Sequence, residues 1–301
     1  MILAVHSQII FVSKELSLSL VAAKVSADVL YDMIEIVEAQ TWVKEYLDEF
    51  SDLWNICDHR SEQVFLKELI KEFVILDSAK ERKAYKDLDA KITAWSLRPE
   101  TTWIVAACND IEIDGSVAAM QKLKNKLTPY DDWHARMLPS IPSGAKSVRN
   151  GDFVVLFDDF IGSGGKLITK AKWLTKLLSQ NGVEDFTLYY MSVAGMRFGC
   201  DRIADETGCE VFTAVSLDRA ISDKYEPRVA DEYKRLMLGL ELKLHEEYKR
   251  KKIKDYSLGF SKSEALYCVE NDNCPNNVFP VFWWARLKSG DRFRTLLRRA
   301  G

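Results

Sequence analysis

The 301-residue sequence has few glycines and prolines, no closely spaced cysteine pair and few histidines. Its 14 glycines and 7 prolines exclude collagen-like and low-complexity chains. None of the six cysteines forms a Cys-x-x-Cys pair, and only four histidines accompany them, which disfavours a structural zinc site. Isolated thiols in apolar surroundings are typical of proteins kept in a reducing cytosol.

A long apolar run and an excess of one charge are also missing. The 42 basic and 45 acidic residues leave a net charge of −3, which argues against a surface built throughout for nucleic acid. The last 16 residues are nevertheless basic, with six cationic side chains and one acid over 286–301. His6, Ser13, Lys14 and Glu15 interrupt the apolar start of the chain, so it lacks the run of about 18 apolar residues that a transmembrane helix needs. We therefore expect a cytoplasmic protein without a membrane partner.

The first third of the chain has helical periodicity. Apolar residues recur at helical spacing over 61–76, and Ser78 with Glu81 predicts a capping box at the start of the next helix. Pro99 ends this pattern, because the residue before a proline is pushed out of the helical conformation. The sequence thus predicts a helical N-terminal region over 1–98.

Beyond Pro99, short apolar runs alternate with helical stretches. The apolar runs cover 103–107, 153–157, 187–193, 211–215 and 266–269. The helical stretches lie near 115–127, 165–180, 197–207 and 226–249, and the basic run 249–252 is expected at the solvated end of the last one. Such alternation indicates βαβ units. We therefore predict an α/β domain over 99–301, built on an open, mostly parallel sheet.

One segment combines a predicted strand with candidate functional residues. The apolar run 153–157 leads into Asp158 and Asp159, and then into a glycine-rich loop of Gly162, Ser163, Gly164, Gly165 and Lys166 that opens a helix. Glycines let the backbone approach an anion, and the amides of a helix start favour phosphate there. Two acids beside a phosphate would be repelled unless they bind ribose hydroxyls, directly or through Mg²⁺. The alternative is a helix cap followed by a tight turn. The loop lacks the spacing of a Walker A motif.

Residues 153–166 resemble the signature of type I phosphoribosyltransferases, in which two acids after a strand hold the ribose of phosphoribosyl pyrophosphate (PRPP). The resemblance implies that Asp158 and Asp159 are catalytic, that the loop 162–166 binds a 5′-phosphate, and that Mg²⁺ accompanies PRPP or a nucleotide. Lys166 stands where the family usually has threonine. A lysine can serve a phosphate as a point charge. We expect both acids at a solvent-facing strand end, where losing a charge costs little stability.

Two further motifs, one on each side of residues 153–166, indicate which phosphoribosyltransferase-like proteins the chain resembles. In the family order, the loop Asp114-Gly115-Ser116 would receive pyrophosphate, but Ser116 could equally cap the following helix. Near the C-terminus, the segment 275–284 offers Asn276 as a candidate wall of the site, or forms a rigid loop whose aromatic residues fill the core. Together these motifs resemble the phosphoribosyltransferase-like effectors of bacterial conflict systems, including retron-associated anti-phage loci.

Two functions follow from the sequence. The first is an effector that binds PRPP or a related ribose phosphate or nucleotide and is the toxic or defence component of an anti-phage system; glycosyl transfer at the ribose anomeric carbon is the reaction that the resemblance implies. The alternative is a catalytically inactive nucleotide sensor that docks a protein or nucleic-acid partner of such a system. No motif identifies the acceptor or the oligomeric state.

Overall fold

The computed structural model describes residues 26–111 and 114–300. The helices are α1 (Ala27–Ala39), α2 (Leu47–Asn55), α3 (Arg60–Lys71), α4 (Ser78–Ala94), α5 (Gly115–Leu123), α6 (Tyr130–His134), α7 (Ile141–Ser147), α8 (Gly165–Gln180), α9 (Arg197–Thr207) and α10 (Pro227–Glu241). The strands are β1 (Val74–Leu76), β2 (Thr102–Ala106), β3 (Met137–Leu138), β4 (Asp152–Ile161), β5 (Phe186–Met196), β6 (Val211–Leu217), β7 (Glu247–Tyr248), β8 (Lys251–Lys252) and β9 (Tyr267–Val269). Short 3₁₀ helices cover Thr41–Glu45, Ile253–Asp255, Phe260–Lys262 and Pro280–Phe282.

The main sheet has five parallel strands in the order β3-β2-β4-β5-β6. Its central strand, β4, is buried on both faces, and residues 154–157 are all 0% exposed. This explains the continuous apolar run in the sequence, because a strand covered on both sides has no solvent-facing position for polar residues. The prediction of an α/β fold with an open parallel sheet is confirmed.

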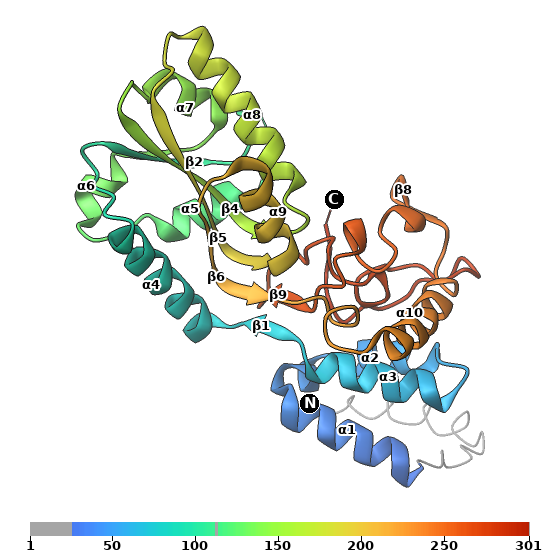
Figure 1. Ribbon diagram of the computed structural model, residues 1–301. Coiled ribbons are helices and arrows are strands. Elements are labelled where there is room, and N and C mark those ends of the chain that lie inside the picture. The colour runs from blue at the N-terminus through green and yellow to red at the C-terminus, as the bar shows by residue number, and fades with distance from the viewer. Residues whose placement is uncertain (1–25, 112–113, 301) are drawn as a thin grey trace, which may run out of the picture.

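Helices cover both faces of this sheet, as Figure 1 shows. Apolar residues of α7, α8 and α9 pack on one face, against alternate β4 residues such as Val154 and Leu156. Residues of α4 and α5 pack on the other face, against Val155 and Phe157. Residues after β4 therefore enter a space between the starts of α8 and α5, where ligands bind in open α/β sheets.

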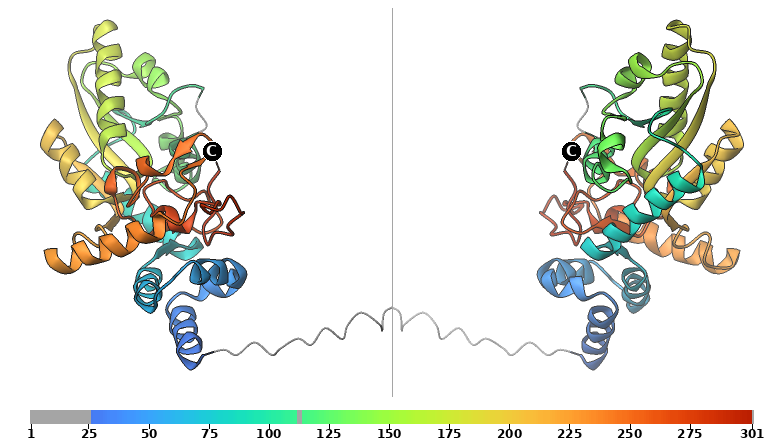
Figure 2. Two further views of the ribbon diagram at one scale, coloured as in Figure 1. Left: turned by 90° about the vertical axis from the view of Figure 1, so that its right-hand side faces the viewer. Right: turned by 90° about the vertical axis from the view of Figure 1, so that its left-hand side faces the viewer.

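The described N-terminal helices α1 to α3 and the C-terminal segment from α10 onward form a second lobe beside the sheet (Figures 1 and 2). Strand β1 pairs in parallel with β9, which places Val74 opposite Tyr267. Phe73 packs edge-on against Phe282 at 5.0 Å, and the Arg294 guanidinium lies 2.7 Å from a carboxylate oxygen of Asp52. The C-terminal segment is thus fixed to the N-terminal helices by apolar and ionic contacts.

Several sequence predictions about these elements are wrong. The helix expected over 61–76 ends at Lys71, and β1 follows it, so the leading region is not purely helical where it is described; residues 1–25 of the predicted region 1–98 lie outside the described residues. Residues 267–269 of the apolar run 266–269 form β9, which joins β1 rather than the main sheet. A β1 strand of three residues is too short to interrupt helical periodicity, which explains why the sequence pattern missed it.

Two predicted helix ends also differ. Asp77, not Ser78, caps α4, because its carboxylate accepts the amides of Ala79 and Lys80, each at 2.9 Å. Helix α10 ends at Glu241 instead of near 249, and the basic run 249–252 lies in and beside the turn of the β7–β8 hairpin. Lys249 and Arg250 both have positive φ angles there, which no helix accommodates.

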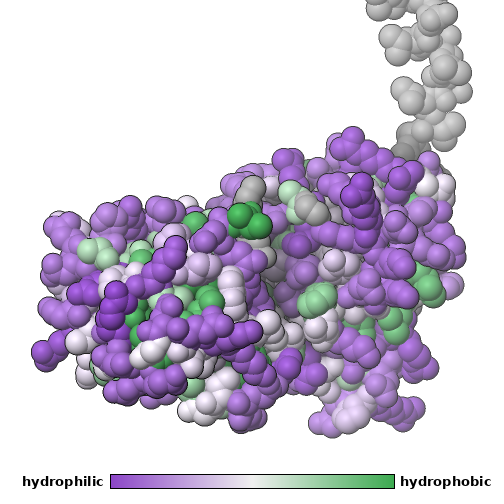
Figure 3. Space-filling view, turned by 90° about the horizontal axis from the view of Figure 1, so that it is seen from above, coloured by the Kyte–Doolittle hydropathy of each residue, from purple (hydrophilic) through white to green (hydrophobic). Residues whose placement is uncertain are grey.

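No helix in the described parts of the chain is long and apolar enough to cross a membrane. The face seen in Figure 3 is mainly hydrophilic, and its hydrophobic residues form small, separate patches.

Glu241, at the end of α10, is expected to make the stability of the protein depend on pH. The residue is 5% exposed, and its carboxylate accepts hydrogen bonds from Ser257 Oγ and from the Leu258 amide. Burial raises the pKa of Glu241 from 4.5 to about 7, although these two hydrogen bonds oppose the rise. Between these pH values the folded protein holds a proton that the unfolded chain has released, so stability falls as pH rises through this window.

We therefore expect Glu241→Gln to reduce the loss of stability between about pH 5 and about pH 8, by up to ~3 kcal/mol at ~1.4 kcal/mol per pKa unit. Urea unfolding of both proteins at the two pH values measures the effect. The exposed Glu246, changed to Gln, is the matched control and should leave the pH dependence as it is. Parallel pH profiles for the wild type and Glu241→Gln would contradict the prediction.

Candidate functional site

The two acids of the glycine-loop segment lie within β4, which continues to Ile161 instead of ending at residue 157. Because successive side chains of a strand point to opposite faces, Asp158 turns toward α8 and Asp159 toward α5. Asp158 is 1% exposed, whereas Asp159 is only partly buried. The expectation that both acids face solvent is therefore wrong for Asp158.

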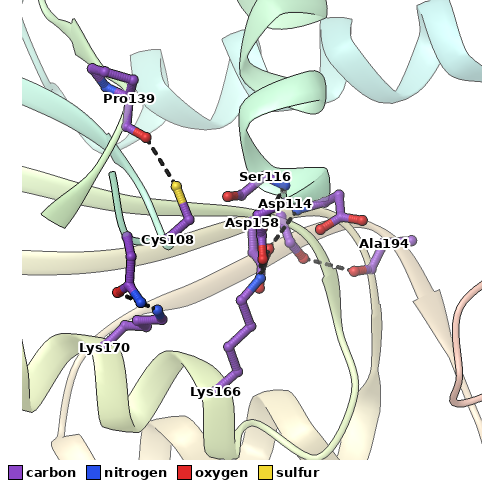
Figure 4. Close-up of polar contacts among 11 residues, drawn as sticks. Cys108, Asp114, Ser116, Pro139, Asp158, Lys166, Lys170 and Ala194 are labelled. Atoms are coloured by element: carbon purple, nitrogen blue, oxygen red, sulfur yellow. Dashed lines mark hydrogen bonds and ion pairs between the residues drawn. The ribbon is translucent and has the colours of Figure 1, made fainter. Parts of the chain in front are cut away.

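Lys166, in the first turn of α8, links two of the acids. Its Nζ lies 2.8 Å from Asp158 Oδ1 and 2.9 Å from Asp114 Oδ1, and Figure 4 shows the side chain rising from α8 between them. The lysine that the sequence placed in the phosphate loop thus directs its charge to the carboxylates. It neutralises part of the repulsion among them.

The protonation of this group follows from burial and charge. Burial raises the pKa of Asp158 well above its ordinary value, and the neighbouring Asp159 adds to the rise, although the Lys166 ammonium opposes it. For Asp114 burial also acts upward, but the charge of Lys166 and the hydrogen bonds from Lys166 and Ser116 together outweigh it and lower the pKa. Burial acts to lower the pKa of Lys166, but the neighbouring carboxylates of Asp158 and Asp114, together with Asp159, outweigh it and raise the pKa. Lys166 and Asp114 are therefore charged at neutral pH.

The glycine-rich loop turns directly into α8. Gly164 precedes the helix with φ +77, a left-handed conformation that favours glycine, and no side chain caps this N-terminus. The first amides of a helix have no partner within it, so an uncapped N-terminus can bind an anion. The loop also contacts the start of α9, because a Cβ on Gly199 would lie 1.9 Å from the Gly162 carbonyl oxygen.

The loop before α5 lies next to the acids. Asp114, not Ser116, caps α5: Asp114 Oδ1 accepts the Ser116 amide at 2.9 Å, and Ser116 is fully buried. The interpretation of Ser116 as the helix cap is therefore wrong. A Cβ on Gly115 would lie 2.2 Å from Asp159 Oδ2, so only glycine allows this acid to pack against the loop.

These pieces line one cleft of about 470 Å³, a size typical of small-molecule sites. All the predicted site residues except two line this cleft: Asp114, Gly115, Asp158, Asp159, Gly162, Ser163, Gly164, Lys166 and Asn276. The exceptions are Ser116, which is buried, and Gly165. Gly165 is the next residue of the same loop. In the C-terminal segment, Trp283 and Trp284 are 4% and 0% exposed, which agrees with the packing interpretation for these aromatic residues.

The model of the PRTase-CE family matches residues 43–299. The chain belongs to the PRTase-CE family. The match covers the sheet, the cleft and most of the second lobe, and the predicted resemblance to type I phosphoribosyltransferases is confirmed at the level of family and fold.

Solved structures similar to this PRTase-CE chain include three phosphoribosyltransferases. The orotate enzyme of Aeropyrum pernix is 14% identical, with 44% of this chain and 68% of that chain covered and a TM-score of 0.29. The adenine enzyme of Thermoanaerobacter pseudethanolicus is 18% identical, with 46% and 82% covered and a TM-score of 0.28. The purine enzyme of Pyrococcus horikoshii Ot3 is 11% identical, with 45% and 79% covered and a TM-score of 0.25. No curated protein matches the chain.

The PRTase-CE cleft contains residues that sequence reasoning missed. Among its charged residues are Glu81 of α4, Lys122 of α5, Asp272 of the C-terminal segment and Arg299 near the chain end. Tyr267 of β9 lies beneath it and stacks on Phe160 at 5.3 Å. Each lies far in sequence from the glycine-loop segment and belongs to no local motif, so only the folded chain reveals its place.

Three carboxylates of the cleft could hold a cation. One oxygen each from Asp114, Asp158 and Asp159 lies within 4.8 Å of the others. The second carboxylate oxygen of Asp158, Oδ2, is buried without a hydrogen-bond partner. Buried polar atoms are normally satisfied, and Mg²⁺ prefers oxygen ligands of this kind. The residues present therefore fit a magnesium ion.

Proposed function

We propose that this phosphoribosyltransferase-like protein binds PRPP, or a related ribose phosphate or nucleotide, with Mg²⁺ in the cleft. The observation that carries the proposal is the meeting of three parts in one cavity: the uncapped start of α8, the acids of β4 and the loop before α5. An uncapped helix start suits a 5′-phosphate and neighbouring carboxylates suit ribose hydroxyls. The loop at Gly115 would receive the pyrophosphate.

The charge of the cleft supports a role for Mg²⁺. Five carboxylates and three cationic side chains line it, so its formal charge is negative. A polyphosphate entering alone would be repelled by the nearest of these acids. Asp114, Asp158 and Asp159 would hold the ion, which supplies positive charge to the pyrophosphate oxygens when bound.

The chain's own residues would act by position and charge. The 162–166 amides would bind the 5′-phosphate, and Asp159 would accept hydrogen bonds from ribose hydroxyls. Lys166 would keep the charged Asp114 and the buried Asp158 in place. In transfer, the bond from the anomeric carbon to pyrophosphate breaks and a bond to the acceptor forms. Nearby carboxylates favour the positive charge that develops on the ribose.

Isothermal titration calorimetry with PRPP tests the proposal. We expect binding with Mg²⁺ present and its loss when EDTA removes the metal, because the acidic cleft then repels the ligand. Mass spectrometry of samples supplemented with candidate acceptors separates the two functions: release of pyrophosphate indicates an enzyme, and PRPP that stays bound and intact with every acceptor indicates a sensor. The absence of binding to PRPP, ribose 5-phosphate and nucleotides, all with Mg²⁺, would overturn the proposal.

The anti-phage effector role belongs to the proposal as well, and its support is the resemblance of the Asp114-Gly115-Ser116 and 275–284 motifs to conflict-system effectors. Expression in a bacterial host tests it. If the role is correct, toxicity or phage resistance depends on the cleft and disappears in Asp159→Asn. A variant that loses ligand binding and retains full toxicity would show that the effect arises elsewhere.

A further inference from the structure

The cations of the cleft differ in their partners. Lys166 pairs with Asp114 and Asp158, and Lys122 lies 2.8 Å from Glu81 and 3.7 Å from Asp272. Arg299 pairs with no carboxylate among residues 26–111 and 114–300. It is thus the cleft cation whose charge the described protein leaves uncompensated.

Arg299 is held in place all the same. Its Nη1 donates to the carbonyl oxygen of Cys274, and its guanidinium lies 5.4 Å from the centre of the Trp283 ring. Its Nε is buried without a hydrogen-bond partner. Burial lowers the pKa of Arg299, although the nearby Cys274 and Tyr256 oppose the change. A fixed, partly desolvated guanidinium without an anion is costly, and an anionic ligand removes that cost.

The position of Arg299 relates it to the cleft's ligand. The segment 272–277 crosses the cavity wall from Asp272, which pairs with Lys122 of α5, to Asn277, whose side chain packs on Gly162 of the glycine-rich loop. Arg299 is attached to this segment at Cys274, between those two ends.

We propose that Arg299 is an anion-binding residue of the cleft and takes an oxyanion group of the ligand, a phosphate or a carboxylate. A guanidinium presents a planar fork of donors that matches either group. The inference deepens the proposed function, on which it rests for the identity of the ligand. Two sources could supply the oxyanion: the pyrophosphate group of PRPP, or an acidic acceptor.

Titrations with Mg²⁺ present separate these sources. The variants are Arg299→Gln, Arg299→Lys and the control Arg298→Gln, which changes an exposed neighbour that does not line the cleft. The probes are inorganic pyrophosphate, ribose 5-phosphate and, on protein saturated with PRPP, the carboxylates benzoate and nicotinate. Loss of one charge-assisted pair should weaken the affected probe roughly tenfold or more.

The probes that lose affinity in the variants identify the group that Arg299 binds. Weaker pyrophosphate binding in Arg299→Gln, with ribose 5-phosphate unchanged, places the pyrophosphate at Arg299; weaker binding of carboxylates alone places an acidic acceptor there. Arg299→Lys should retain part of the affinity, since it keeps the charge and loses the fork. Pyrophosphate binding that depends on Arg299 supports the inference even if PRPP fails to bind, in which case only the proposed function falls. Equal binding of every probe by wild type and Arg299→Gln, or by neither, overturns the inference.

Discussion

Asp159→Asn is expected to weaken the binding of Mg²⁺–PRPP by about tenfold to a hundredfold, because a charge-assisted hydrogen bond is worth ~1.5–3 kcal/mol. The side chain of Asp159 faces the cleft and forms no ion pair within the described parts of the chain. Asparagine keeps one neutral acceptor oxygen and replaces the other with a donor, which suits neither a ribose hydroxyl nor a cation. Isothermal titration calorimetry measures the change.

The free energy of unfolding should change little in this variant, because Asp159 forms no ion pair among the described residues that the substitution would break. The control is Asp185→Asn, an exposed acid just before β5, at the opposite end of the sheet from the cleft. We expect it to bind as the wild type does. A correctly folded Asp159→Asn with unchanged affinity for Mg²⁺–PRPP would contradict the assignment of the acid to the ligand.

Asp158 is a poorer choice for this test, because it is buried. The sequence alone could not predict that burial. The sequence places both acids after an apolar run, which suggests a solvent-facing strand end. In the structure β4 continues past them, and Asp158 is buried against Lys166. Replacing this carboxyl group would remove one of the two hydrogen-bond partners of Lys166, so the variant would change stability and binding together.

The central strands and the glycine-rich loop could be predicted because their signals are local. An apolar run such as 153–157 marks a strand buried on both faces, and the adjacent glycines mark a loop that opens a helix. The β1–β9 pair joins residues about 190 positions apart, and Arg299 lines the same cleft as a glycine-rich loop more than 130 positions before it. No periodicity within one segment carries such information.

The contact of Gly199 with the glycine-rich loop also could not be predicted from the sequence. In the sequence it is an ordinary glycine early in a helix, yet in the structure α9 meets the glycine-rich loop there. A Cβ at this position would lie 1.9 Å from the Gly162 carbonyl oxygen and 3.2 Å from the Gly164 nitrogen. Both atoms are backbone, so neither can turn aside as a flexible side chain does. Either α9 or the loop must move.

We therefore expect Gly199→Ala to weaken the binding of ribose 5-phosphate and to lower the free energy of unfolding by roughly 1–3 kcal/mol, the usual cost of overpacking. Titration calorimetry and urea unfolding measure the two effects. Gly239→Ala in α10 is the matched control: the nearest atom to its Cβ would be Glu62 Oε1 at 4.0 Å, so it should gain ~0.5–1 kcal/mol from helix propensity and bind normally. If Gly199→Ala binds ribose 5-phosphate as tightly as Gly239→Ala does, the phosphate cannot depend on the position of the 162–166 loop.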